Sequence, residues 1–496
     1  MSEKTIMVTE QKSPNLIRAT IHGTIWSYAT TYSAKALVFI STVILARLLL
    51  QEDYGVAGYA LVIISFIEIL EGLGIGQALI YYERTPERAS TGFWLSLAAG
   101  IGLMLITYFI AAPLGGWFFK DPRAVEVTRL LSLSLPISAL GLVHEYLLIK
   151  ALAFKQKFVP ELAKALAKGL VSIVLALSGW GAWSLIWGQL AGTAVSVIAF
   201  WLVIPWRPTI QFDKAAARSL LSYGLKIISN GGISIFLLNL DYLLIGHYMG
   251  AAALGVYTLA FRMPELLIKE FSSVIGRVMF PVYAKMKDDG QRLSRGFLLT
   301  LQYVNMITVP LGLGLALVAK PFVLVAFTEK WVEAIPVMSA IALYSLLRAM
   351  VLNVGDAYKA QGRPGLLAQI HMVQAIISIP LLWWAAAVHG TITAVAWSQV
   401  TISLIAAIIK LLIAGRILNI SLGTILKALQ GSLAAGAVMS VAVSGSLQLG
   451  INWPPLLQLI FCVAIGGFTY LATLWLLYRN TLFEAGQTLR ANLSRR

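Results

Sequence analysis

The sequence contains little charge and almost no cysteine. Asp, Glu, Lys and Arg make up 12% of its 496 residues, and Cys462 is the single cysteine. One cysteine excludes an intrachain disulfide, and its place within an apolar segment predicts that its side chain is packed in the interior. The sequence also lacks a P-loop, a metal-type cluster of His and Cys, and a nucleophile with a nearby base. We therefore expect no cofactor, no metal site and no enzyme active site.

Polar connections long enough to form a soluble domain are absent as well, since the longest are 206–219 and 283–295. What the sequence has instead is apolar residues, at 58% with a mean hydropathy of +0.80, against roughly 45 to 50% in soluble proteins. Its charge-free runs exceed the roughly 20 residues that cross a bilayer as a helix, and the alternation typical of membrane strands is missing. The predicted fold class is an all-α polytopic membrane protein.

We expect about fourteen transmembrane helices of this length. The apolar run 169–206 is too long for one span, and the glycines in Ser178-Gly179-Trp180-Gly181 predict a turn between two helices. The same reasoning along the chain predicts spans at 23–47, 56–82, 90–114, 129–149, 165–180, 183–205, 220–247, 253–282, 296–319, 335–355, 366–387, 391–412, 425–447 and 455–478.

The net charge of +16 is distributed unevenly between the two sides of the membrane. Most Lys and Arg residues lie on the even-numbered connections and on the two tails. The odd-numbered connections hold only Arg47, Lys120, Arg123, Lys320 and Lys330, with Arg129 at a span edge. This asymmetry predicts that both termini are cytoplasmic, and it explains the basic charge without a nucleic-acid partner. The first 20 residues do not resemble a cleavable signal peptide, so we expect the first span to direct insertion.

Two parts of the chain are weakly similar at an offset near 200. Residues 47–56 align with 247–256, and 187–189 align with 397–399. Parallel repeats of this kind occur in many transporters, whose substrate site lies near the midplane between the two lobes. The predicted organisation is a cytoplasmic tail at 1–22, a six-helix lobe at 23–205, a cytoplasmic linker at 206–219, a second six-helix lobe at 220–412, an appended helix pair at 413–478 and a cytoplasmic tail at 479–496.

Several segments resemble those of polysaccharide-transporter (Wzx-like) flippases of the multidrug/oligosaccharidyl-lipid/polysaccharide (MOP) superfamily, most closely the colanic-acid and exopolysaccharide exporters. The similar segments are Ile44 to Gly55, Asn239 to Gly246, Leu254 to Tyr257, Arg277 to Tyr283, Phe327 to Trp331 and Ala334 to Pro336. The resemblance covers nearly the whole chain. It implies that the protein moves an undecaprenyl-diphosphate-linked oligosaccharide from the cytoplasmic to the periplasmic leaflet.

Cations within predicted spans are costly unless they face a partner or a water-filled cavity. Arg262, Glu265 and Lys269 share one helical face, and Arg277 lies close to that face two turns beyond Lys269. Since Arg and Lys both bind phosphate oxygens, we predict a cationic substrate cavity. Its candidate residues are Arg262, Lys269, Arg277, Arg348 and Lys35.

Each candidate also has a structural alternative. The face of Arg262, Glu265 and Lys269 could be neutralised internally, and Arg277 could be an interfacial anchor. Lys35 could pair with Glu68 or Glu71. Lys168 and Lys226 lie near cytoplasmic span ends, where side chains that extend to the interface explain them, so they are not candidates.

Four acidic residues within the spans are candidates for coupling transport to H+ or Na+: Glu68, Glu71, Glu145 and Asp241. Glu68 and Glu71 face the same side, where burial and like charge favour proton binding. Structural roles remain open for all four, namely pairing with Lys35, hydrogen bonds between helices, or, for Glu145, an ion pair with Lys150.

The predicted function is therefore a flippase of the bacterial inner membrane that works by alternating access of two lobes around the cationic cavity. Its expected partners are the lipid-linked oligosaccharide, membrane lipids, and the polymerase and glycosyltransferases of the same pathway. One alternative is a multidrug exporter of the same superfamily, which would have an acidic cavity and no appended helix pair. A second is a membrane polymerase or ligase for the same glycan, which would have a large outer loop.

Overall fold

The computed structural model describes residues 33–68, 70–83, 85–151, 153–269, 289–363 and 365–494, together with 279, 282, 283 and 286. For 154, 226–234, 269 and 478–494 it describes the backbone alone. The parts of predicted span 23–47 before residue 33, and of span 253–282 after residue 269, lie largely outside these residues.

The described residues form helices, as the fold-class prediction requires. After a helix at 33–48 come α2 (Gln51–Glu68), η1 (Glu71–Gly74), α3 (Ile75–Tyr81), α4 (Pro86–Ile106), η2 (Thr107–Ala111), α5 (Ala112–Phe119), α6 (Arg123–Leu131), α7 (Ser134–Lys150), α8 (Phe154–Leu177), α9 (Ala182–Val203), α10 (Lys214–Pro264) and η3 (Glu265–Lys269). The remainder are α12 (Gly290–Leu317), α13 (Ala319–Ala326), η4 (Glu329–Trp331), α14 (Ala334–Met350), α15 (Val354–Ala360), α16 (Gly365–Trp383), η5 (Trp384–His389), α17 (Ile392–Ile417), α18 (Leu422–Leu449) and α19 (Pro455–Ser494).

Within the described residues, 11 helical stretches are long and apolar enough to cross a membrane. The protein is therefore a multi-pass membrane protein, while the count of fourteen spans stays a prediction. The turn expected at 178–181 is confirmed, because α8 ends at Leu177 and α9 begins at Ala182. The predicted spans 220–247 and 253–282 are joined in α10, which bends at Gly250, where φ is 81°.

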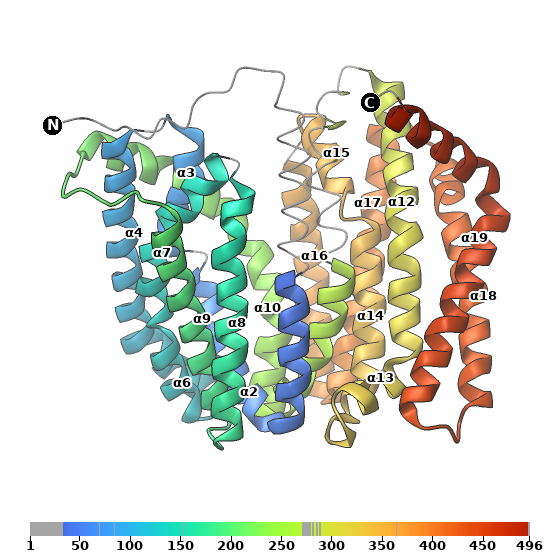
Figure 1. The fold of residues 1–496 in the computed structure, drawn as a ribbon, viewed down its shortest axis with the longest axis horizontal. Helices are drawn as coiled ribbons and strands as arrows, with labels where there is room; N and C mark the ends of the chain where they lie inside the picture. The colour runs from blue at the N-terminus through green and yellow to red at the C-terminus, as the bar shows by residue number, and fades with distance from the viewer. Residues whose placement is uncertain are drawn as a thin grey trace.

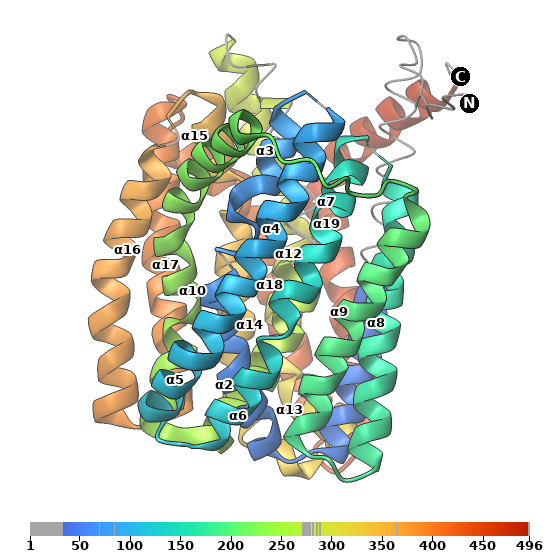
Figure 2. The same cartoon turned by 90° about the vertical axis from the view of Figure 1, so that its left-hand side faces the viewer.

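The helices form two groups that stand side by side (Figures 1 and 2). Helices α3 to α9 lie in one group, and α12 to α17 lie in the other, with α10 packed against members of both. Helices α18 and α19 pack on each other at the edge of the second group, against α12 and α13. Buried Cys462 belongs to the apolar cluster at that contact. The exact lobe boundaries stay predictions.

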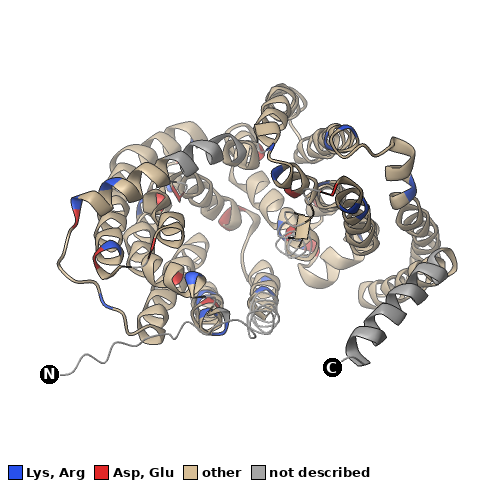
Figure 3. Ribbon diagram, turned by 90° about the horizontal axis from the view of Figure 1, so that it is seen from above, with Lys and Arg blue, Asp and Glu red and all other residues tan. Residues whose placement is uncertain are grey.

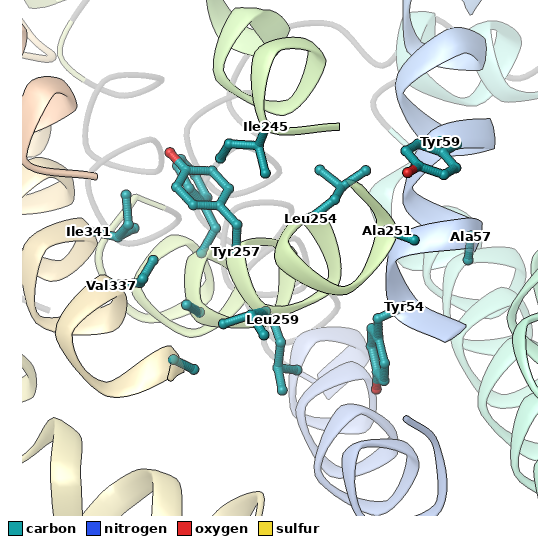
Figure 4. Close-up of a cluster of buried hydrophobic side chains, with 14 of the residues drawn as sticks. Tyr54, Ala57, Tyr59, Ile245, Ala251, Leu254, Tyr257, Leu259, Val337 and Ile341 are labelled. Carbon is teal, nitrogen blue, oxygen red and sulfur yellow. The ribbon is translucent and has the colours of Figure 1, made fainter. Parts of the chain in front are cut away.

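Among the described residues, the apolar core joins the two groups at one end of the molecule only. A single cluster runs from Leu45 through α2, α10, α13 and α14 to Ile402, and Figure 4 shows its centre, where side chains of α2, α10 and α14 meet. At the other end the core divides into a cluster of the first group and a separate cluster of the second. We call the joined end the gate end; it is the lower end in Figure 1.

The repeat at an offset of 200 appears as a reciprocal contact at the gate end. A Cβ atom on Gly55 would lie 1.7 Å from the carbonyl oxygen of Ala251, and one on Gly255 would lie 1.8 Å from that of Gln51. Gln51 and Ala251 are themselves equivalent in the repeat. The two contacts are therefore related by an approximate two-fold axis. Any side chain at either position would separate α2 from α10.

Span 56–82, predicted as one helix, is broken at η1. Gly72, Leu73 and Gly74 all have positive φ, at 68°, 46° and 66°. Glycine adopts this conformation without steric cost, which Leu73 cannot. Irregular backbone at membrane depth is tolerated where it is buried in protein or lines a water-filled cavity. The break is therefore expected to line a cavity or to be packed against other helices.

Candidate functional site

A cavity opens on the side of the molecule away from the gate end, and one wall of it is basic. Lys35 of the helix 33–48, Lys164 and Lys168 of α8, and Arg262 of α10 line a space of about 500 Å³, and Glu145 and Glu161 line its edge toward α7 and the start of α8. We call the part of the cavity lined by Lys35, Lys164, Lys168 and Arg262 the basic half. Seen from above, Lys and Arg occur on helices of both groups (Figure 3). Of the five predicted cationic residues, Lys35 and Arg262 are brought together here.

Lys168 is central to the basic half, although its sequence position indicated a side chain that reaches the membrane interface. Its Nζ donates a hydrogen bond to Oε1 of Gln189, 2.6 Å away, inside the first helix group. Arg262 and Lys164 line the same space, so three positive side chains lie close together there. Gln189 belongs to the repeated Trp-x-Gln segment, so the repeat was the signal that could have identified this site.

The same cavity continues into an acidic half. A space of about 570 Å³ is lined by Glu68, by Glu71 at the broken backbone of η1, and by Glu145 of α7. Lys164 and Gln189 line both spaces, so the basic and acidic halves are contiguous. The hydroxyl of Ser138 donates to Glu71. The two acidic residues predicted to face the same side therefore do line a cavity.

A narrower pocket of about 140 Å³ extends from the basic half toward the gate end. It is lined by Arg262, Lys168 and Gln189 together with the hydroxyls of Ser172 and Thr258. Both hydroxyls are buried and have no hydrogen-bond partner within the described part of the chain. A buried polar group without a partner costs free energy, typically about 1 to 3 kcal/mol, which a polar ligand could recover.

Arg348 lies apart from the basic half, in the second helix group. Its Nη1 donates to the Tyr344 hydroxyl at 2.7 Å, and it lines a pocket of only about 30 Å³ together with Glu265. The prediction that Arg348 shares a cavity with Lys35 and Arg262 is therefore not met in this arrangement. The Lys269 side chain and Arg277 lie outside the described residues.

Asp241 is buried in the second helix group and accepts three hydrogen bonds. Its Oδ2 accepts hydrogen bonds from the Tyr257 hydroxyl and from Gln399 Nε2, each at 2.7 Å. Its Oδ1 accepts one from the Tyr242 backbone amide at 3.0 Å. Gln399 corresponds to Gln189 in the repeat. In the second group this glutamine donates to the Asp241 carboxylate, whereas in the first group it accepts from the Lys168 ammonium.

Glu145 pairs with a different lysine from the one expected. Its Oε1 lies 2.8 Å from Nζ of Lys157, which also contacts Glu161 at 3.2 Å. Lys150 Nζ, the expected partner, donates to the backbone carbonyl of Leu79 at 2.8 Å. The sequence separation was misleading because the chain turns after α7, and this turn brings the start of α8 back toward Glu145.

The gate end is closed by hydrogen bonds between the two helix groups. Arg47 Nε donates to the carbonyl of Ala326 at 3.1 Å, and Lys330 Nζ donates to the carbonyl of Arg47 at 2.7 Å. The buried indole of Trp331 donates to the carbonyl of Ala46 at 2.7 Å. We call these five residues the latch. All of them except Ala326 come from the two segments that resemble family motifs, Ile44 to Gly55 and Phe327 to Trp331, so those motifs have a packing role.

Comparison with known proteins agrees with this architecture. The family described as "Polysaccharide biosynthesis protein" matches residues 44–336, more than half of the chain. The chain belongs to this family. The predicted resemblance to polysaccharide biosynthesis proteins is thereby confirmed.

Relatives of this polysaccharide biosynthesis protein cover most of its length. It is 25% identical to the teichuronic acid biosynthesis protein TuaB of Bacillus subtilis, over 94% of this chain and 98% of the relative. It is 25% identical to the succinoglycan biosynthesis transport protein ExoT of Rhizobium meliloti, over 92% and 93%. It is 27% identical to the lipopolysaccharide biosynthesis protein WzxC of Escherichia coli, over 74% and 75%.

Solved structures share the fold. An inward closed structure of the lipid II flippase MurJ has a TM-score of 0.75 at 16% identity, covering 92% of this chain and 100% of that one. An inward-facing multidrug resistance transporter of the MATE family, in the MOP superfamily, has a TM-score of 0.63 at 15% identity, covering 80% and 98%. These likenesses establish the helix arrangement.

Proposed function

We propose that this family member is a flippase for a lipid-linked oligosaccharide, carried on undecaprenyl diphosphate, and that it works by alternating access. The cavity that is basic on one wall, closed at the latch and open at the other end, carries this proposal. A diphosphate needs cations inside the membrane, and Arg262, Lys168 and Lys35 provide them in one space. The relatives named for teichuronic acid, succinoglycan and lipopolysaccharide synthesis support the glycan assignment.

The direction of transport follows from the charge asymmetry of the loops. By the positive-inside rule the latch faces the periplasm or cell exterior, and the open cavity faces the cytoplasm. We propose that the protein lies in the cytoplasmic membrane with both termini inside, accepts its substrate at the inner leaflet and releases it outside once the latch has parted. Reporter fusions after residue 120 and after residue 496 test this: active alkaline phosphatase at 496 would contradict it.

A coupling ion, H+ or Na+, is part of the proposal, with Glu68 and Glu71 as its candidate residues because they line the cavity. Asp241 is a weaker candidate, since its three donors already satisfy its carboxylate. The polymerase and glycosyltransferases of the same pathway are proposed partners, as they would supply and consume the lipid-linked glycan.

The experiment measures polymer export in a strain that lacks its own flippase. We expect Arg262→Ala and Lys168→Ala each to reduce export roughly ten- to a hundredfold, the range for losing one charged hydrogen bond of about 1.5 to 3 kcal/mol. Arg262→Lys should retain part of the activity. Lys427→Ala, at an exposed position of α18, is the control and should export normally. Normal export by both cavity variants at normal protein amounts would overturn the proposal.

The multidrug alternative predicts an acidic cavity without an appended helix pair. The cavity does have an acidic half, but its basic half would repel cationic drugs, and α18 and α19 are present. Drug efflux by the protein in cells without any polymer pathway would favour that alternative.

A further inference from the structure

The acidic half of the cavity has no role in holding a diphosphate, since carboxylates repel phosphate. It is nevertheless the larger part of the space, at about 570 Å³ against about 500 Å³ for the basic half. Sites that enclose a small molecule have volumes of about 300 to 1,000 Å³. The acidic half is therefore large enough to receive the part of the substrate that follows the diphosphate.

The lining of the acidic half is chemically suited to sugar. An ionised carboxylate is a pure acceptor with about four lone-pair sites, and each sugar hydroxyl offers one donor. Glu68 and Glu71 provide such acceptors, when ionised, on the wall formed by α2 and η1. Hydroxyl and amide groups of Ser134, Ser138, Thr193, Ser196 and Gln77 surround them, and these can both donate and accept.

Two of these hydroxyls are available to a ligand. Ser134 and Ser196 are each only 7% exposed and line the acidic half, and in the described part of the chain neither hydroxyl makes a hydrogen bond. A nearly buried hydroxyl without a partner is costly, so its exposure to the cavity indicates a ligand or water at that point.

The broken helix gives the space its shape. The positive-φ residues Gly72 and Gly74 interrupt the span directly after Glu71 and line the acidic half themselves. A Cβ atom on Gly72 would meet Leu142, and one on Gly74 would meet the backbone of Gly224, so the missing side chains let the break pack closely against α7 and α10. Discontinuous helices of this kind form substrate sites in many transporters.

The two halves are contiguous at Lys164 and Gln189, so one ligand can occupy both. The two repeated spans also carry different charges, since α2 and η1 place Glu68 and Glu71 in the acidic half while α10 places Arg262 in the basic half. We propose that the acidic half, at the helix break Glu71–Gly74, binds the sugars next to the diphosphate and selects neutral or amino sugars over uronic acids. This proposal rests on the proposed flippase function.

The test uses purified protein in liposomes and two substrates on undecaprenyl diphosphate. Each carries a fluorescent disaccharide. The two disaccharides differ only in the sugar attached to the diphosphate, which is a hexose in one and the matching hexuronic acid in the other. Dithionite, which does not cross the bilayer, quenches the molecules that have reached the outer leaflet. The ratio of the two flipping rates is the readout.

We expect the wild-type protein to move the hexose substrate faster than the uronic acid substrate. Glu71→Gln and the separate Glu68→Gln variant should slow the hexose and speed the uronic acid, so that the rate ratio falls by roughly tenfold, which corresponds to 1.4 kcal/mol. Ser134→Ala should slow both substrates, because it removes a hydrogen bond without changing charge. Glu126→Gln, at an exposed position of α6, is the matched control and should keep the wild-type ratio.

The outcomes separate the proposals. A wild-type ratio near one, or the same factor of loss for both substrates in the Glu variants, would overturn the sugar subsite and leave Glu68 and Glu71 with ion coupling alone or a structural role. Flipping of neither substrate by the wild-type protein would overturn the proposed function itself. Arg262→Ala should slow both substrates without changing their ratio.

Discussion

Replacing Gly255 with alanine should open the gate end. The new Cβ atom would lie 1.8 Å from the carbonyl oxygen of Gln51, whereas such atoms essentially never approach within 3.0 Å. Helices α2 and α10 must therefore separate by about 1.2 Å or deform, because both contacting groups are backbone. Gly255 does not have a positive φ, so alanine suits its backbone conformation and the effect is purely one of space.

The magnitude follows from overpacking and from the latch. Overpacking costs about 1 to 3 kcal/mol, and this cost applies only while the gate end is closed. A separation of about 1.2 Å would also lengthen the 2.7 Å bonds of Lys330 and Trp331 beyond the range of a good hydrogen bond. A shift of 1 to 3 kcal/mol changes the open-to-closed ratio roughly 5- to 150-fold.

The assay measures access to the pocket beneath the latch. Thr42 lines that pocket, so Thr42→Cys can be labelled with a membrane-impermeant maleimide from outside only when the gate end opens. The native Cys462 is buried and should contribute little. We expect Gly255→Ala to raise the labelling rate in proportion to the open population. Trp331→Phe, which keeps an aromatic side chain but removes the indole N–H that donates to Ala46, should also raise the labelling rate.

Gly102→Ala is the matched control. Gly102 lies in α4 with nothing within 4 Å of its added Cβ, so this substitution changes no contact. Equal labelling of the Gly255→Ala and Gly102→Ala proteins, at equal amounts in the membrane, would refute the reasoning. It would mean that the close approach of α2 and α10 does not hold the gate end closed.

Three further predictions concern individual contacts. Gly72→Ala should lower the melting temperature in detergent, because φ is +68° and the new Cβ would lie 2.5 Å from Leu142 Cδ1. The strain should cost about 1 to 3 kcal/mol of stability. Gly102→Ala is the control and should leave the melting temperature unchanged. Tyr257→Phe should cost about 1 to 3 kcal/mol of stability by removing a donor from buried Asp241, whereas Tyr303→Phe at a 41% exposed position should be neutral in the same thermal assay. Gln189→Leu should lower polymer export because Lys168 loses its acceptor, and Gln189→Glu, which keeps an acceptor, should restore it; equal export by both would show that the contact is dispensable.

Sequence reasoning succeeded where local composition decides the outcome. A helix inserts in the membrane because of its own apolar length, so the all-helical membrane fold and the turn at 178–181 were predictable, whereas the count of fourteen spans stays a prediction. The family could be recognised from short segments such as Phe327 to Trp331. The cost of burying a charge also made Lys35 and Arg262 candidates for a cavity, and both line it.

The membership of the site depended on contacts between distant helices. Lys168 was set aside because it lies near a span end, yet the packing of α8 against α9 places its Nζ on Gln189 in the cavity. Arg348 was included because it is deep, yet it faces Tyr344 and Glu265 in the other helix group. Depth in the membrane follows from position in a span, whereas the direction that a side chain faces follows from which helix packs beside it.

The sequence by itself determined that this is a polytopic helical membrane protein with buried cations and a repeated scaffold. Only the tertiary structure decided that the two repeated glycines make equivalent contacts, that the second span breaks after Glu71, and that basic and acidic halves share one cavity. The physical reason is that insertion depends on one segment at a time, while a cavity and a closed gate need surfaces from segments up to about 280 residues apart, as in the bond between Arg47 and Lys330.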